Sequence, residues 1–323
     1  MKPLTANELL VMDRPTLVRY MPPLVEEKVL GMIHAWRGVG KTHFILELAC
    51  ALCSGARFLK WECLQPAKVL FIDTEMTSER MADRLLKIAQ GCKYEFCGDN
   101  LGFYSADMFP SSKIPDISEP EGANWLLRTA KLYDVIIIDN LSGIAVLSKD
   151  SDEKTWARIE PIFMKLRAMG KCVIMIHHSN KSGTQSGTSK KESPLDWVIQ
   201  LKRPADYSAD EGARFDITFE KTRNFYGAWA EDISAMMMFD DEGKRTWQWE
   251  SKSNSLEDIV RKMKKFGMSA QQISKDTGTP LFRVKVMLKQ INDEFEMNKP
   301  KPEDKRSGIE FTIPAEREAD DQF

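Results

Sequence analysis

One stretch decides how this chain folds: residues 29–42, which read VLGMIHAWRGVGKT. Its first part, Val29–His34, is largely apolar and predicts a buried strand. An apolar helical pattern, Thr42–Cys53, follows the glycine-containing loop directly. A strand, such a loop and a helix N-terminus together form an anion site, because backbone N–H groups at the helix start point at the ligand. The stretch therefore predicts a phosphate-binding loop inside an α/β fold.

The loop also predicts which groups hold the phosphates. We expect six consecutive residues to bind ATP: Gly38, Val39, Gly40, Lys41, Thr42 and His43. The two glycines let backbone N–H groups turn inward. Lys41 would contact the β- and γ-phosphates, and the Thr42 hydroxyl would bind Mg²⁺. The usual pattern has Gly where this chain has Ala35, which we expect to adopt an ordinary backbone angle. A turn and helix start without a ligand is the alternative.

Two further apolar runs end in acidic residues. Val135–Asp139 has the Walker B form, and a carboxylate at the end of such a strand can hold a Mg²⁺ water ligand beside the loop. The run ending at Asp73 is followed closely by Glu75, which could polarise the attacking water. Glu75 as a helix-capping acid is the alternative for that residue. We expect Asp73 to have a structural role.

The alternation of patterns predicts an α/β domain with a mostly parallel sheet and helices on both faces. The strand-like runs are Val29–His34, Lys68–Asp73, Leu101–Tyr104, Asp134–Asp139 and Cys172–His177. The helical patterns between them are Thr42–Cys53, Ser78–Gln90, Gly122–Leu132 and Lys154–Met169. Two later alternating segments, Arg214–Lys221 and Ala228–Met237, predict antiparallel strands at the sheet edge.

Composition excludes several classes of protein. The 323 residues are 42% hydrophobic and 29% charged, which is typical of an ordinary globular chain. No apolar run approaches the length of a membrane span, and the charged N-terminus does not resemble a signal peptide. We therefore expect a cytoplasmic protein with no membrane partner. The six cysteines lack zinc spacing and predict reduced thiols, and the net charge of −2 requires any nucleic-acid site to be local.

Changes in sequence character predict four segments: a lead-in at 1–28, the α/β domain at 29–250, a helical domain at 255–297 and a charged, mobile tail at 298–323. In the third segment, a short helix at Ser269–Asp276 is followed by a Gly278 turn and a helix at Leu281–Ile291. This order predicts a helix-turn-helix. DNA binding, protein binding and support of assembly are all compatible with it.

With these residues assembled, the chain resembles RecA-like P-loop ATPases, among them the RepA-type hexameric replicative helicases and the relatives of DnaB and KaiC. The segments that carry the resemblance are AWRGVGKT, FIDTEM, VIIIDN, IHHSNKSG and EKTRNFYG. The resemblance implies a ring, in most cases a hexamer, that hydrolyses ATP with Mg²⁺ and acts on single-stranded DNA. The resemblance further implies that Glu75 is the general base and that His178 senses the γ-phosphate. The adjacent His177 is the alternative residue for the sensor role.

The resemblance also implies a site shared between subunits. Lys221 and Arg223 match a Lys-x-Arg pair that reaches the neighbour's ATP, where the arginine neutralises charge on the phosphoryl oxygens. A solvated basic pair at a hairpin is the alternative. The lysine- and serine-rich loop at 179–191 could grip a nucleic-acid backbone. Two other functions stay open: a nucleotide-switched recombination, repair or regulatory ATPase without unwinding activity, and a plain DNA-binding module.

Overall fold

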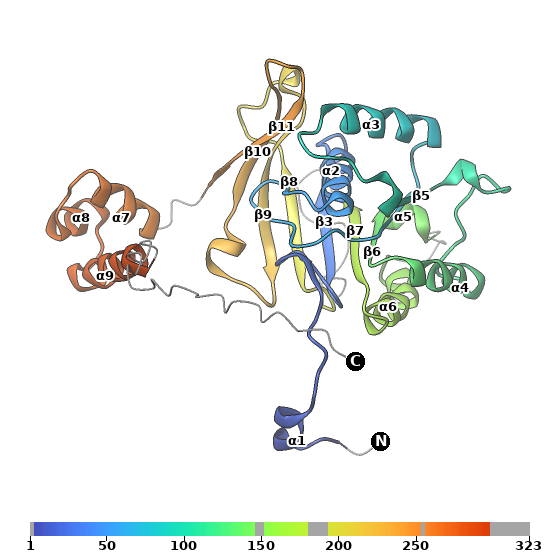
Figure 1. Cartoon of the computed structure of the whole chain (residues 1–323), viewed down its shortest axis with the longest axis horizontal. Helices are drawn as coiled ribbons and strands as arrows, with labels where there is room; N and C mark the ends of the chain where they lie inside the picture. The colour runs from blue at the N-terminus through green and yellow to red at the C-terminus, as the bar shows by residue number, and fades with distance from the viewer. Residues whose placement is uncertain (1–2, 146–151, 180–192, 253–255, 298–323) are drawn as a thin grey trace, which may run out of the picture. The chain divides into compact units, whose positions relative to one another are not determined.

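The structure is a computed structural model that describes residues 3–145, 152–179, 193–252 and 256–297. The predicted basic loop at 179–191, except Ser179, and the predicted tail lie outside these residues. The described chain divides into two compact units, residues 1–253 and 254–323. Figure 1 labels their helices and strands.

A nine-stranded sheet forms the centre of the first unit, in the order β11-β10-β9-β8-β3-β7-β6-β4-β5. Six of these strands are parallel: β3 (Leu30–Ala35), β4 (Val69–Asp73), β5 (Leu101–Ser105), β6 (Val135–Asp139), β7 (Cys172–His178) and β8 (Trp197–Lys202). Three antiparallel strands extend the edge: β9 (Arg214–Thr222), β10 (Ile233–Phe239) and β11 (Arg245–Ser251). The predicted α/β class with a mostly parallel sheet is confirmed.

Alternating side chains build two cores on the two faces of the sheet. Val135 and Ile137 of β6 contribute to one core, and Ile136 and Ile138 to the other. This division follows from the two-residue period of a strand. The first core includes α2 (Lys41–Ser54) and α3 (Ser78–Gly91). The second includes α4 (Pro120–Thr129), α5 (Leu141–Ile144) and α6 (Asp152–Ala168), and α4 packs against α6 (Figure 1).

The N-terminal lead-in has two parts. Residues 3–17, which include α1 (Ala6–Val11), are exposed, and Thr5 caps this helix by accepting the Glu8 N–H. A short hairpin of β1 (Arg19–Met21) and β2 (Val25–Glu26) follows, and its apolar side chains join the first core. The hairpin thus fixes the start of β3, the strand that leads into the glycine loop.

The second unit is helical, as predicted. It contains α7 (Leu256–Lys265), α8 (Ala270–Thr277) and α9 (Leu281–Met297) around a core of Val260, Ile273, Val284 and Ile291. Ser269 caps α8 through a capping box, and Gly278 ends it with a left-handed backbone. Within the described parts of both units, no helix has the length and apolar character needed to cross a bilayer.

Candidate functional site

The carboxyl ends of β3, β4, β6 and β7 meet at one edge of the sheet, because parallel strands all end on the same side. A pocket of about 560 Å³ lies there. It is lined by Arg37, Gly38, Gly40, Lys41, Thr42, His43, Glu75, Arg84, Asp139 and His178. Side chains that are more than a hundred residues apart in the sequence are thus brought together as predicted.

The glycine loop has the backbone that an anion cradle requires. Gly38 and Gly40 have φ angles of 76° and 119°, a region that other residues rarely adopt. Gly40 is also the N-cap of α2, so the first N–H groups of that helix open into the pocket. Ala35 is the last residue of β3, which shows that an ordinary strand backbone suffices at this position. Val39 is buried against the core beneath the loop.

Lys41 is buried, and its Nζ lies 3.1 Å from the Ala35 carbonyl oxygen and 3.2 Å from His178 Nδ1. Burial lowers the pKa of Lys41, while the nearby carboxylates of Asp139 and Glu75 raise it. An ammonium group can only donate, so His178 Nδ1 accepts and His178 Nε2 carries the ring proton. That N–H donates to Glu75 Oε1 over 3.1 Å. His178 therefore links the loop lysine to the predicted base.

Glu75 is further held by Asn140, which sequence reasoning missed, and by Asp73. Asn140 Nδ2 donates to Glu75 Oε1 over 2.5 Å. Asp73 Oδ1 accepts the backbone N–H groups of Glu75 and Met76 at 2.8 and 2.7 Å, so the predicted structural role of Asp73 has a geometric basis. Burial raises the pKa of Asp73, and these two N–H bonds lower it. Thr74 Oγ1 accepts the Asn140 N–H over 3.1 Å, which ties the ends of β4 and β6 together.

Asp139 is the carboxylate at the centre of the pocket. It is 4% exposed, and among the described residues its Oδ2 has no hydrogen-bond partner. Burial raises its pKa to about 6, and a hydrogen bond from Thr42 partly offsets this. An unpaired buried carboxylate oxygen is costly unless a cation or a donor meets it. Asp139 and Thr42 therefore fit Mg²⁺, a metal that takes few protein ligands and completes its shell with water and phosphate oxygens.

The basic pair Lys221 and Arg223 lies at the other end of the sheet. Thr222, between them, pairs with Trp197, and Trp197 pairs with Gly31 near the start of β3. From Gly31, β3 rises about 13 Å before it reaches the phosphate loop, whereas β9, which is antiparallel to β8, runs away from that loop. The two cations converge on one carbonyl oxygen, that of Ser193, at 3.3 and 2.6 Å. The chain's own phosphate loop is beyond their reach.

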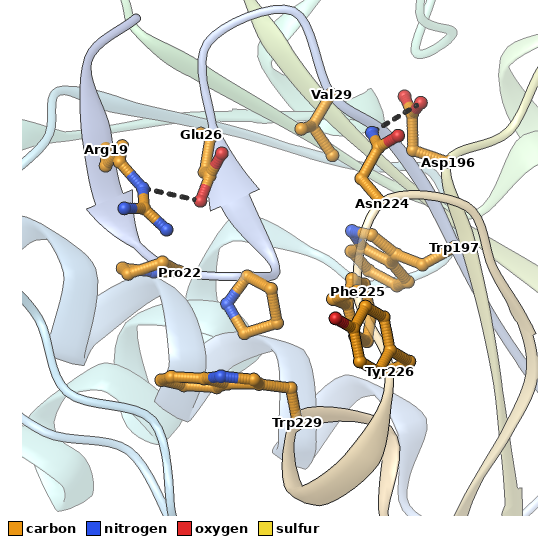
Figure 2. Close-up of a pocket in the computed structure, with 11 residues that line it drawn as sticks. Arg19, Pro22, Glu26, Val29, Asp196, Trp197, Asn224, Phe225, Tyr226 and Trp229 are labelled. Atoms are coloured by element: carbon orange, nitrogen blue, oxygen red, sulfur yellow. Dashed lines mark hydrogen bonds and ion pairs between the residues drawn. The ribbon is translucent and has the colours of Figure 1, made fainter.

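A second pocket, of about 450 Å³, lies next to Arg223. Figure 2 shows Tyr226 and Trp229, from the β9–β10 connection, on one side of this pocket, and the ion pair of Arg19 and Glu26, from the β1–β2 hairpin, on the other side beyond Pro22. Tyr226 is 86% exposed and Trp229 52%. Large exposed aromatic side chains beside a pocket are typical of surfaces that bind another protein.

A comparison with known protein families identifies the family of this chain. A family model described as an AAA domain matches residues 1–184. The chain belongs to this family. The first unit is accordingly a P-loop ATPase domain, and the family implies ATP and Mg²⁺.

Solved structures with a similar fold include a KaiC-like protein from Pyrococcus horikoshii OT3, with 12% identity and a TM-score of 0.48 over 71% of this chain and 93% of that one. Another is the flagellar accessory protein FlaH from Methanocaldococcus jannaschii, with 15% identity and a TM-score of 0.44 over 69% and 90%. No curated protein matches the sequence significantly.

Proposed function

We propose that this chain is a ring-forming ATPase whose subunits complete one another's active sites, and that the ring, a hexamer, acts on single-stranded DNA in replication. The observation that carries the proposal is the separation of Lys221 and Arg223 from the chain's own phosphate loop. A cation pair so far from its own loop is suited to the loop of a neighbour. The exposed Tyr226 and Trp229 beside Arg223 offer an apolar contact for that neighbour.

Within one site, the residues divide the chemistry. The backbone N–H groups at Gly38–Thr42 and the Lys41 ammonium hold the phosphates, and Thr42 and Asp139 hold the metal. Mg²⁺, when bound, neutralises charge on the β- and γ-phosphate oxygens. Glu75 accepts a proton at Oε2 from the attacking water, while its Oε1 is oriented by Asn140 and His178.

His178 is suited to report the state of the γ-phosphate. Its two ring nitrogens contact Lys41 and Glu75, so a phosphate that draws Lys41 away changes both hydrogen bonds together. His177 precedes it on the strand and is buried beside the β3 strand, opposite His34. Strand alternation directs the two histidines to opposite faces, which favours His178 for this role.

DNA contact is proposed from the basic residues of the second unit. Arg283, Lys285 and Lys289 of α9 are exposed and follow the turn at Gly278. Contacts from such side chains to phosphates give binding without sequence reading. The loop at 180–191, the other proposed DNA contact, lies outside the described residues.

The direct experiment measures ATP hydrolysis against protein concentration, with and without single-stranded DNA. The proposal predicts that specific activity rises with concentration and rises further with DNA, in parallel with ring formation seen by light scattering. An activity indifferent to both would leave the nucleotide-switched alternative in place of the ring. Strand separation is then measured separately with a forked DNA substrate.

A further inference from the structure

A polar cluster, buried at His34 and Ser179 and exposed at Glu220, lies outside the nucleotide pocket and joins three strands. His34 of β3 is fully buried. Its Nδ1 lies 2.7 Å from the Ser179 hydroxyl, just past β7, and its Nε2 lies 2.7 Å from Glu220 Oε2 on β9. A carboxylate only accepts, so Nε2 of the neutral imidazole donates to Glu220, and Nδ1 accepts a hydrogen bond from the Ser179 hydroxyl. The neighbours on both sides therefore fix one tautomer.

A β-bulge directs Glu220 toward this histidine. Val198 of β8 pairs with Lys221, but the next residue, Ile199, pairs with Phe219, so Glu220 is the extra residue between them. Bulges of this kind redirect a side chain and bend the strand. The bulge immediately precedes Lys221 and lies three residues before Arg223. The direction of Glu220 and the direction of the cation pair are thus set at the same place.

The other end of the cluster is attached to the groups that face the phosphates. The Ser179 N–H donates to the Ala35 carbonyl oxygen over 3.1 Å, and the same oxygen accepts from Lys41 Nζ at 3.1 Å. The residue before Ser179 is His178, which contacts both Lys41 and Glu75. A change in the contacts of Lys41 therefore reaches Ser179 by two routes. One is the backbone from His178 to Ser179, and the other is the Ala35 carbonyl oxygen, which accepts from both Lys41 and Ser179.

Serine, histidine and a carboxylate in a row also occur in nucleophilic hydrolases. Here Ser179 is 4% exposed and His34 is fully buried, so neither the serine hydroxyl nor the imidazole ring faces a substrate. Burial of a satisfied network instead gives rigidity and a unique geometry. We propose that His34 is a positioning residue that couples the nucleotide pocket of a subunit to the Lys221 and Arg223 pair it presents to its neighbour. The inference rests on the proposed shared site.

A double-mutant cycle tests the coupling. Ser179→Ala and Glu220→Ala each remove one arm of the cluster, and we expect each to lower the kcat of the assembled enzyme about tenfold, within the range typical of coupled sites. Because both act through His34, the double variant should be no slower than the slower single variant. Glu220→Gln keeps an oxygen that can accept from Nε2 and should restore most of the activity.

The controls separate coupling from structure. Gln200→Ala removes another side-chain donor to Glu220, over 3.0 Å, while leaving both ring hydrogen bonds of His34 in place, and should leave kcat within about twofold of wild type, as for an ordinary surface substitution. Affinity for an ATP analogue should stay unchanged in the two alanine variants, whereas their free energy of unfolding should fall, because each leaves one ring nitrogen of the buried His34 without its partner. Multiplicative effects in the double variant, unchanged kcat in both single variants, or an affinity loss that matches the kcat loss would each overturn the coupling.

Arg223→Ala, measured in parallel, distinguishes the two proposals. If that variant keeps its assembly-dependent activity, the shared site itself is wrong. If it loses activity while Ser179→Ala and Glu220→Ala do not, only the role of His34 is wrong.

Discussion

The two ends of the central sheet differ in kind. At the carboxyl end, Lys41, Thr42, Glu75, Asp139 and His178 surround one pocket and contact one another. At the amino end, Lys221 and Arg223 converge on a carbonyl oxygen beside a pocket with exposed aromatic side chains. The first end has the groups that the proposed function assigns to the nucleotide, and the second has Arg223, which the proposed function assigns to the phosphates of a neighbour. The difference supports the proposal that one subunit carries halves of two different sites.

The largest expected effect comes from removing the arginine at the amino end. Arg223→Ala should lower the kcat of the assembled enzyme by about 10³-fold or more, the range for an arginine supplied in trans. Nucleotide affinity of a single subunit should be unchanged, since Arg223 is far from its own loop. The measurement is steady-state hydrolysis together with binding of a fluorescent ATP analogue. Arg57→Ala, an exposed arginine paired with Glu62, is the matched control and should be silent.

The base at the carboxyl end gives the next largest effect. Glu75→Gln should lower kcat by about 10²- to 10⁴-fold, because an amide cannot take the proton from water. Binding should persist, since the amide oxygen can still accept from Asn140 and His178. Single-turnover hydrolysis measures the loss. Glu79→Gln, a neighbouring exposed acid on α3, serves as the control, and an equal loss there would remove Glu75 from its special role.

Much of the carboxyl end could be predicted from the sequence. The glycine loop and the acids after the apolar runs are local patterns, and parallel strands place their ends together. Asn140 and Arg84 could not be found in this way. Asn140 resembles an ordinary helix cap, and it does cap α5. Its side-chain amide also donates to Glu75, which lies 65 residues earlier in the sequence. Such contacts depend on tertiary packing and have no local period.

The amino end was less predictable. The strands β8 and β11 were missed, and β10 begins at Ile233 rather than at Ala228, because a short 3₁₀ turn occupies Gly227–Ala230. The bulge at Glu220 leaves the alternation of β9 nearly intact in the sequence, so only the register reveals it. The sequence indicated a basic pair at the end of the predicted strand Arg214–Lys221, but not that this end lies far from the phosphate loop.

Cations gathered at the carboxyl end predict a pH effect on stability. Burial, together with the nearby cations Arg84, Arg245 and Lys87, lowers the pKa of His43 to about 4. As the pH is lowered, the His43 imidazole therefore takes up a proton near pH 6.5 in the unfolded chain, but only near pH 4 in the folded chain. The free energy of unfolding should therefore fall as pH drops through this window, by about 3 kcal/mol at most.

Urea unfolding at several pH values measures this pH dependence of the free energy of unfolding, with His43→Gln as the comparison. The variant should have a shallower pH slope between 6.5 and 4, and equal slopes would contradict the assignment. The phosphates of a bound nucleotide should raise the pKa of His43, which NMR of the imidazole protons detects.

The smallest expected effect concerns packing at the amino end. A Cβ on Gly31 would lie 2.1 Å from the Trp197 ring, whose indole N–H donates to the Leu24 carbonyl oxygen. Gly31→Ala should therefore cost about 1–3 kcal/mol of unfolding free energy, as overpacking does. Urea unfolding measures it, with Gly98→Ala, beside the side chain of Phe96, as a milder control. ATP-analogue affinity, which depends on the other end, should change little.

Mixing two inactive variants tests the division of the site most directly. Lys41→Ala lacks the phosphate-binding ammonium but keeps Arg223, and Arg223→Ala has the reverse defect. In rings assembled from equal amounts, about a quarter of the interfaces should pair an intact loop with an intact arginine, because each site draws on two neighbouring subunits. The account predicts that the mixture recovers up to that share of wild-type hydrolysis while each variant alone stays inactive. A mixture no more active than its components, in rings shown to contain both, would contradict it.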